Sequence, residues 1–206
     1  GGGLEINADR FAFDWSKGAK LYAEGSARLK SLAQLPKAWR QGIPASTAVS
    51  GGRFEGNAGI QGDRWQVNGK LASTTVVAEG ERVSNVRVSI AASERSAVGK
   101  IESATWSGVP LRGAFDVSAK SGAVNAFIQS DSVNLGPLAR RYNLPLTGSG
   151  DLRAVISSLK GRPQIWISSA GRARYRLDNG QPFSGDYEAQ LSGNLTRLDV
   201  NQAVLS

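Results

Sequence analysis

The stretch RARYRLDNGQPFSGDYEAQL, residues 172–191, decides the fold of this chain. Apolar residues occupy every second position from Ala173 to Leu177 and again from Tyr187 to Leu191. Alternation with a period of two is typical of a β-strand with one apolar and one solvated face. Between the two runs, Asp178-Asn179-Gly180 supplies residues that tolerate the positive φ angles of a tight hairpin. The stretch therefore predicts two antiparallel strands joined by a turn.

The same period of two runs through nearly the whole chain. Alternating runs begin near Leu21 and recur at short, even spacing, with glycine-rich or charged turns between them. The 25 glycines show no triplet period, which indicates turns, bulges and strand kinks. Short strands at even spacing predict an all-β protein. We expect a long curved or twisted sheet, or an open, solenoid-like groove of the β-taco kind, with one or two short helices.

Two stretches interrupt the alternation with helical spacing, residues 31–41 and 134–142. In the second, Asn134 can cap the helix and Pro137 lies in its first turn, where the missing N–H is not needed. Pro36 lies further inside the first stretch, which disfavours a helix there. A proline, a glycine-rich turn and alternating strands follow each stretch. This order predicts two loose repeats, over about residues 31–129 and 130–206.

The two ends of the sequence suggest a piece of a longer protein. Residues 1–3 are three glycines, which we interpret as a tag remnant. The alternating pattern still continues at the other end of the chain. We expect residues 4–206 to be one elongated β segment of a longer chain.

The residue types exclude most catalytic chemistry. The chain has no histidine and no cysteine, so Ser-His-Asp and Cys-His arrangements and almost every zinc site are impossible. Two carboxylates can still act as a glycosidase pair, and Asp116, Asp151, Asp178 and Asp186 are the candidates. These acids fall at ordinary turn or solvent-face positions. We therefore expect no enzyme activity, no metal ion and no cofactor.

The charge favours anionic partners. The net charge is +8 and the isoelectric point is about 10.1, a balance that attracts phosphates, phospholipid headgroups or acidic polymers. The sequence contains no recognised nucleic-acid module, and the tryptophans fall mostly on the apolar phase of the alternation. We expect no nucleic-acid partner. No apolar run reaches the length of a membrane-spanning helix.

From Ser130 onward, a series of short motifs follows a specific order. The motifs are SDSVNLGPL at 130–138, LPLTGSGDL at 144–152, LKGRP at 159–163 and LSGNL at 191–195. Their order resembles the TamB and AsmA-like family. In that family a leucine-x-x-leucine helical element leads to leucine-proline-x-x-glycine, a glycine-x-leucine-x-alanine strand and a glycine-x-x-x-x-proline turn. The resemblance covers residues 130–198, and residues 31–93 resemble a more degenerate copy without the last turn.

The resemblance implies a bacterial envelope protein. Members of the family are anchored in the inner membrane, extend through the periplasm and form a long, open, taco-like β structure with an apolar groove. They are implicated in outer-membrane assembly and phospholipid transport, and TamB works with an outer-membrane partner of the BamA type. The resemblance therefore implies a periplasmic location, a phospholipid ligand and a possible BamA-type partner for this segment.

Physical chemistry is compatible with a lipid groove. A sheet with one apolar face must cover that face, close into a barrel or leave a groove for an apolar ligand. An acyl chain is a natural occupant, and arginines at the rim can hold phosphate headgroups. Arg172, Arg174 and Arg176 are the candidate headgroup contacts, and a solvated strand face is the other, favoured interpretation of these three residues. The predicted groove-lining residues are Leu152, Ala154, Ile156, Ile165, Ile167, Tyr175, Leu177, Phe183, Tyr187, Ala189 and Leu191.

Two other functions stay open at this point. The chain can be a structural or scaffolding β-solenoid whose apolar face is a closed core and which binds a protein partner. It can also be an enzyme that acts on a polysaccharide, which is the least favoured because it depends on the scattered acids.

Overall fold

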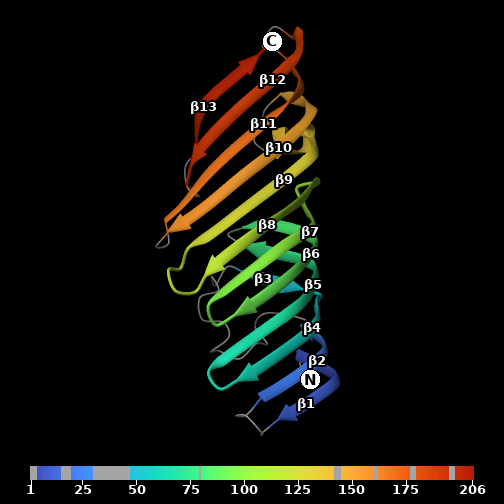
Figure 1. Ribbon diagram of the computed structural model, residues 1–206. Helices are drawn as coiled ribbons and strands as arrows, with labels where there is room; N and C mark the ends of the chain where they lie inside the picture. The colour runs from blue at the N-terminus through green and yellow to red at the C-terminus, as the bar shows by residue number, and fades with distance from the viewer. Residues whose placement is uncertain are drawn as a thin grey trace. The chain divides into compact units, whose positions relative to one another are not determined.

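The computed structural model of the chain describes residues 4–14, 20–29, 47–78, 80–141, 145–159, 162–176, 180–194 and 198–206. In this part of the chain, thirteen β-strands form an open antiparallel sheet (Figure 1). Among the same residues, one short helix packs against a strand of this sheet. The predicted fold class is confirmed. Several predicted features lie outside the described residues: the tag remnant at 1–3, the helix over 31–41, Leu177, Asp178 and Asn179.

The strands fall into two compact units. Unit 1 is Gly1–Thr105 with Ser118–Lys120, and unit 2 is Trp106–Val117 with Ser121–Ser206. The boundary near residue 105 differs from the boundary of the predicted repeats at 129/130. The presence of two sequence repeats stays a prediction.

Unit 1 holds strands β1 to β7. Its hydrogen-bonded order is β1-β2-β4-β5-β6-β7, and β3 pairs with β5. Apart from β3, each strand therefore pairs with the next one along the chain. The bounds are β1 Leu4–Asp14, β2 Lys20–Leu29, β3 Ala48–Ser50, β4 Gly52–Gln61, β5 Arg64–Ala78, β6 Glu81–Ser93 and β7 Ser96–Trp106.

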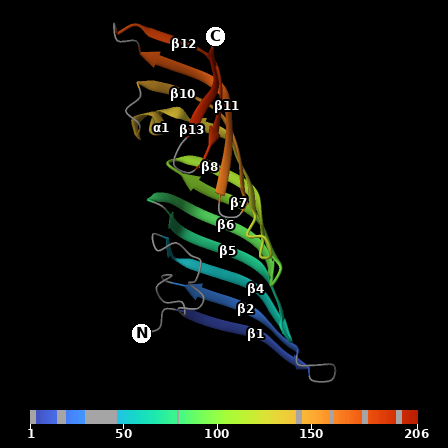
Figure 2. The same ribbon diagram turned by 90° about the vertical axis from the view of Figure 1, so that its left-hand side faces the viewer.

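Unit 2 holds strands β8 to β13 and the helix α1. Its strands pair in chain order, from β8 to β13, and α1 packs against β10. In both units the strands bend along their length (Figure 2). The bounds are β8 Val109–Ser118, β9 Val124–Asn134, α1 Leu135–Arg141, β10 Leu146–Leu159, β11 Arg162–Arg176, β12 Pro182–Gly193 and β13 Leu198–Leu205.

The pairing of β11 with β12 confirms the two strands that residues 172–191 predict. Tyr175 lies opposite Phe183, and the pairing extends to Arg176 opposite Pro182. Gly180, in the connection, has a φ of 81°, a left-handed conformation that glycine adopts without a Cβ clash. The two strands are therefore antiparallel neighbours, as predicted.

The register gives unit 2 one apolar and one polar face. Ala154 lies opposite Ile167, which lies opposite Leu191, and residues directly opposite in an antiparallel pair point to the same side. We call this side the apolar face of unit 2. The other side, which carries Arg153 and Ser168, is the polar face of unit 2. A slip of one residue would exchange the faces, so the alternating pattern disfavours slips of one residue, although a slip of two would keep the faces.

Unit 1 is built in the same way. Ala23 lies opposite Ala58, which lies opposite Val67, and these residues define the apolar face of unit 1. Glu24 and Asn57, one position along, define its polar face. In both units an alternating sequence has become a two-faced sheet.

The described chain has few fully buried apolar residues. A second layer packed on a sheet would bury the large side chains of the apolar face completely. The largest fully buried side chains in the described ranges are only Val109 and Val133. The other buried apolar residues are all alanines, at positions 104, 139, 154 and 173.

The helix α1 begins and ends within one residue of the predicted stretch 134–142. The side-chain oxygen of Asn134 accepts a hydrogen bond from the backbone N–H of Gly136 at 3.0 Å, which is the predicted cap. Pro137 lies in the first turn. Ala139 on the helix and Val133 just before it are buried. The capped helix thus packs against β10 of unit 2.

Replacing Asn134 by alanine should lower the free energy of unfolding of the chain by about 1 kcal/mol, because the first turn of α1 loses its cap. Chemical denaturation followed by circular dichroism measures the change. Asn125→Ala, on the polar face of β9, is the comparison, since it removes an exposed amide and no cap. An equal effect of both substitutions would contradict a capping role.

Candidate functional site

The predicted groove-lining residues lie together on the apolar face of unit 2. Ile156 on β10 lies opposite Ile165 on β11, and Tyr175 lies opposite Phe183 on β12. The row of Ala154, Ile167 and Leu191 lies between them. Leu177 is outside the described residues. The remaining predicted residues complete the same face: Leu152 on β10, and Tyr187 and Ala189 on β12.

Side chains on this face are shielded but not enclosed. Ala154 is buried, while Ile156, Ile167 and Leu191 are half-buried. Their neighbours along the strands, such as Arg153 and Gln190, are exposed. Phe183 remains 43% exposed. The apolar face of unit 2 is therefore a surface that still has apolar area to cover.

Two glycines and a tyrosine shape the middle of this face. Gly150 lies opposite Gly171, which lies opposite Tyr187. A Cβ on Gly150 would meet the Tyr187 hydroxyl at 2.2 Å, so the tyrosine side chain reaches across both glycines. That hydroxyl forms a hydrogen bond with Ser169 Oγ at 2.8 Å, and Ser169 Oγ donates to the Asp151 carbonyl at 2.7 Å. An aromatic side chain that covers glycines in neighbouring strands stabilises a kink in a sheet.

The apolar face of unit 1 has the same construction. Gly25, Gly56 and Gly69 lie side by side on β2, β4 and β5. A Cβ on Gly69 would meet Phe54 Cζ at 2.5 Å, so the phenylalanine ring covers the glycines as Tyr187 does in unit 2. Beside Phe54 the small side chains leave a shallow hollow of about 170 Å³, lined partly by Ala23.

Large apolar side chains on the apolar face of unit 1 are well exposed. Leu21, Ile60 and Trp65 form one row across β2, β4 and β5. Ile60 is 49% exposed and Trp65 is 41% exposed. Our sequence prediction of the lining named only residues of the last third, although Ile60 and Trp65 show the same alternation. Unit 1 therefore has an apolar face of its own, which is a second candidate site.

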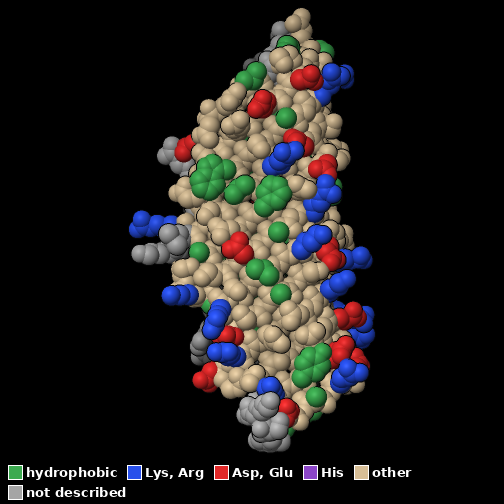
Figure 3. All heavy atoms as spheres, viewed as in Figure 1, with side chains coloured by type: hydrophobic (Ala, Val, Ile, Leu, Met, Phe, Trp, Pro, Cys, Tyr) green, Lys and Arg blue, Asp and Glu red, His purple; other side chains and the backbone are tan. Residues whose placement is uncertain are grey.

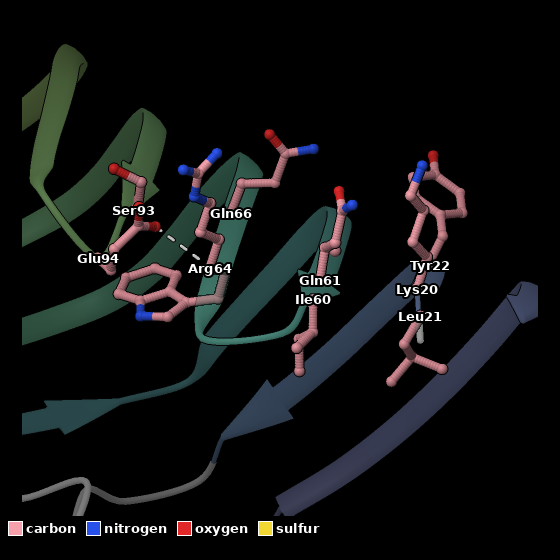
Figure 4. Close-up of a pocket in the computed structure, with 11 residues that line it drawn as sticks. Lys20, Leu21, Tyr22, Ile60, Gln61, Arg64, Gln66, Ser93 and Glu94 are labelled. Atoms are coloured by element: carbon pink, nitrogen blue, oxygen red, sulfur yellow. Dashed lines mark hydrogen bonds between the residues drawn. The ribbon is translucent and has the colours of Figure 1, made fainter. Parts of the chain in front are cut away.

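A pocket of about 400 Å³ lies at the strand ends beside this row (Figure 4). Leu21 and Ile60 point to one side of the ribbon, and Tyr22 and Gln66 point to the other. Glu94 closes the pocket at one end, where its carboxylate accepts a hydrogen bond from the Trp65 N–H at 3.3 Å. The pocket joins apolar and polar side chains at the rim of the sheet.

The arginines predicted to contact headgroups lie on the polar face of unit 2. Arg172 lies opposite Asp186 and forms an ion pair with it at 3.1 Å, and Arg174 lies opposite Ser184. The side chain of Arg176 is outside the described residues. The alternation that puts Ala173 on the apolar face puts both arginines on the other one. They do not line the same surface as the apolar residues.

The three described candidate acids of a glycosidase each have another hydrogen-bond or ion-pair partner. Asp116 accepts a hydrogen bond from Asn125 at 3.0 Å, Asp151 accepts one from the Ala170 N–H, and Asp186 pairs with Arg172. Asp178 lies outside the described residues. Within the described ranges, no group of three acids, histidines or cysteines is placed to hold a metal ion.

The polar face of unit 2 carries an apolar stripe that the sequence prediction missed. Phe127, Val155 and Trp166 lie in one row across β9, β10 and β11, and they are 40%, 45% and 46% exposed. The upper half of the space-filling view shows hydrophobic side chains gathered in a row (Figure 3). Each of the three residues is on a different strand, so the sequence of any one strand does not show that they are neighbours. Only the register between the strands reveals the stripe.

None of the helices among the described residues has the length and apolar composition needed to cross a membrane. Comparison of the chain with protein-family models, with curated proteins and with solved structures finds no match.

Proposed function

We propose that this chain is a segment of a TamB- or AsmA-like bacterial envelope protein, and that its apolar faces carry phospholipid acyl chains between the inner and outer membranes. The observation that carries the proposal is the incomplete burial of the apolar faces in both units. Ile60, Trp65 and Phe183 expose large apolar areas on these faces. Exposed apolar surface of this kind is typical of a site that another apolar molecule covers.

The strength expected of such a site suits transport. Each buried methylene contributes about 0.8 kcal/mol, so about ten methylenes contribute roughly 8 kcal/mol before losses. Acyl-chain and translational freedom is lost on binding, and that loss offsets much of this gain. The net affinity is modest. A lipid can therefore enter one end of an apolar face, move along it and leave.

The cellular setting in this proposal comes from the order of motifs at residues 130–198. That order supports a periplasmic segment of an inner-membrane-anchored protein, with a BamA-type partner in the outer membrane and a role in outer-membrane assembly. The chain has no catalytic role in this proposal, and its ligand is phospholipid.

Purified protein should retain phospholipid. Native mass spectrometry of the chain, expressed in bacteria and purified without detergent, should show adducts with the masses of phospholipids. Delipidated protein should also take up fluorescent phospholipid from vesicles. A chain that is folded by circular dichroism, yet neither retains nor takes up lipid, would refute the proposal.

The apolar stripe of unit 2 favours a second candidate function, a scaffold that binds a protein partner. Phe127, Val155 and Trp166 are on the polar face, away from the proposed lipid path. Trp166→Ser would then weaken partner binding and leave lipid uptake unchanged. A loss of lipid uptake with Trp166→Ser would argue against two separate surfaces.

A further inference from the structure

A row of arginines crosses the polar face of unit 1. Arg28 on β2 lies opposite Arg53 on β4, Arg53 lies opposite Ala72 on β5, and Ala72 lies opposite Arg87 on β6. All four residues are exposed. The row therefore holds three guanidinium groups, with a methyl group in the gap between the second and the third.

The neighbouring row has a different charge pattern. Glu55 lies opposite Lys70, which lies opposite Ser89. Opposite charges on facing strands stabilise a sheet, whereas like charges directly opposite destabilise it. Arg28 opposite Arg53 is such an unfavourable pair. The arginine row thus places like charges side by side, whereas the neighbouring row pairs opposite charges.

The carboxylates near the row neutralise only part of its charge. Glu55 forms an ion pair with Arg53. Glu102 accepts a hydrogen bond from Ser89, and this bond, with the nearby Lys70, Lys100 and Arg87, lowers the pKa of the Glu102 carboxyl. Among the described residues, no ion pair joins Arg28 or Arg87 to a carboxylate. Glu5 on β1 lies opposite Arg28, at the far end of the row. Around Ala72 an excess of positive charge remains, because Arg53, Lys70 and Arg87 outnumber Glu55 and Glu102.

Ala72 makes room for a ligand between the arginines. A hollow of about 300 Å³ lies over it, lined by Arg53, Lys70 and Arg87 together with Glu55 and Glu102. Adjacent strands are about 4.8 Å apart, so Arg53 and Arg87 start roughly 10 Å apart, and their long side chains can converge on one small anion. Guanidinium groups bind phosphate oxygens with paired, charge-assisted hydrogen bonds.

We propose that this row is a binding site for a phosphate-type oxyanion, held between Arg53 and Arg87 over Ala72, with Arg28 and Lys70 as flanking cations. A bound oxyanion removes the repulsion between the like charges and fills the hollow. The site is on the polar face, so it is independent of the proposed lipid path. A chain that fails to bind the oxyanion can still bind lipid on its apolar faces, and the reverse also holds.

Isothermal titration calorimetry with inorganic pyrophosphate at low ionic strength tests the site. The wild-type chain should bind saturably, with an affinity that falls as salt screens the charges. Arg87→Gln should raise the Kd about tenfold, as expected for the loss of charge-assisted hydrogen bonds. Arg95→Gln, which removes an exposed arginine of the β6–β7 turn, should change the Kd by less than about twofold, because Arg95 does not line the hollow.

Ala72→Glu gives a second test, because it puts a carboxylate where the anion should bind. Without ligand, this substitution should raise the melting temperature, since the new carboxylate lies between two guanidinium groups. It should also abolish pyrophosphate binding. Binding that survives Ala72→Glu, or that Arg95→Gln weakens as much as Arg87→Gln does, overturns the proposal, as does an absence of saturable binding by the wild type.

Vesicles distinguish the two sources of the phosphate group. If the natural ligand is a lipid headgroup, vesicles of phosphatidylglycerol should bind the wild-type chain, and Arg87→Gln should weaken that binding. If pyrophosphate binds and Arg87→Gln leaves vesicle binding unchanged, the site takes a free phosphate compound. Neither result depends on lipid uptake by the apolar faces.

Discussion

Replacing Gly171 by valine should destabilise the chain by about 4 kcal/mol or more, the largest stability effect that we expect of a single substitution. A Cβ at this position would be 2.2 Å from the Ser149 carbonyl oxygen and 2.4 Å from the Gly150 Cα. Both are backbone atoms of β10, so no side-chain rotation relieves the contact. The two strands would have to separate at the centre of unit 2.

Chemical denaturation compares Gly171→Val with Ala170→Val. Ala170 is the preceding residue of the same strand, but it is exposed on the polar face. Valine favours strands, so Ala170→Val should change the free energy of unfolding by no more than about 0.5 kcal/mol. Similar stabilities of the two variants would show that the close approach of β10 and β11 is not needed.

The loss of lipid uptake by Leu191→Asp is the largest functional effect that we expect. Leu191 follows Ala154 and Ile167 in the central row of the apolar face of unit 2. A carboxylate in this row would lose hydration when an acyl chain covers it, at a cost of several kcal/mol. Each 1.4 kcal/mol is tenfold in affinity, so uptake of fluorescent phospholipid from vesicles should fall at least about tenfold.

Gln190→Asp is the matched control for this substitution. Gln190 precedes Leu191 on β12, lies opposite Ser168 and is exposed on the polar face. The substitution Gln190→Asp introduces the same charge as Leu191→Asp, one position away and on the other face of the same strand. Lipid uptake should stay within about twofold of wild type, because an exposed carboxylate stays hydrated. Equal losses in the two variants would point to net charge and not to the apolar face.

The site was predictable in its composition but not in its geometry. Alternation along β10, β11 and β12 identified the apolar side chains of unit 2, and the structure places the described ones on one face. The same alternation assigned Arg172 and Arg174 to headgroup contacts, although a period of two puts them on the opposite face. The other interpretation of these arginines, a solvated strand face, agrees with the exposed positions of Arg172 and Arg174.

Features that depend on neighbours across the sheet were not predictable. The stripe of Phe127, Val155 and Trp166 and the row of Arg28, Arg53 and Arg87 join residues far apart in the sequence. Which residues lie opposite one another depends on each turn and on each bulge, such as the register shift between Gly150 and Leu152. A single sequence shows the alternation along each strand but not these offsets.

The sequence by itself determined that this protein is a chain of antiparallel strands with two chemically different faces, because side chains alternate with a fixed period of two along any strand. It also determined the capped helix α1, whose signals are local. Only the tertiary structure decided which side chains meet across the strands: Tyr187 over Gly150 and Gly171, Phe54 over Gly56 and Gly69, and the arginines around Ala72. Those contacts depend on strand register, which results from the packing of the whole sheet and not from any one stretch of sequence.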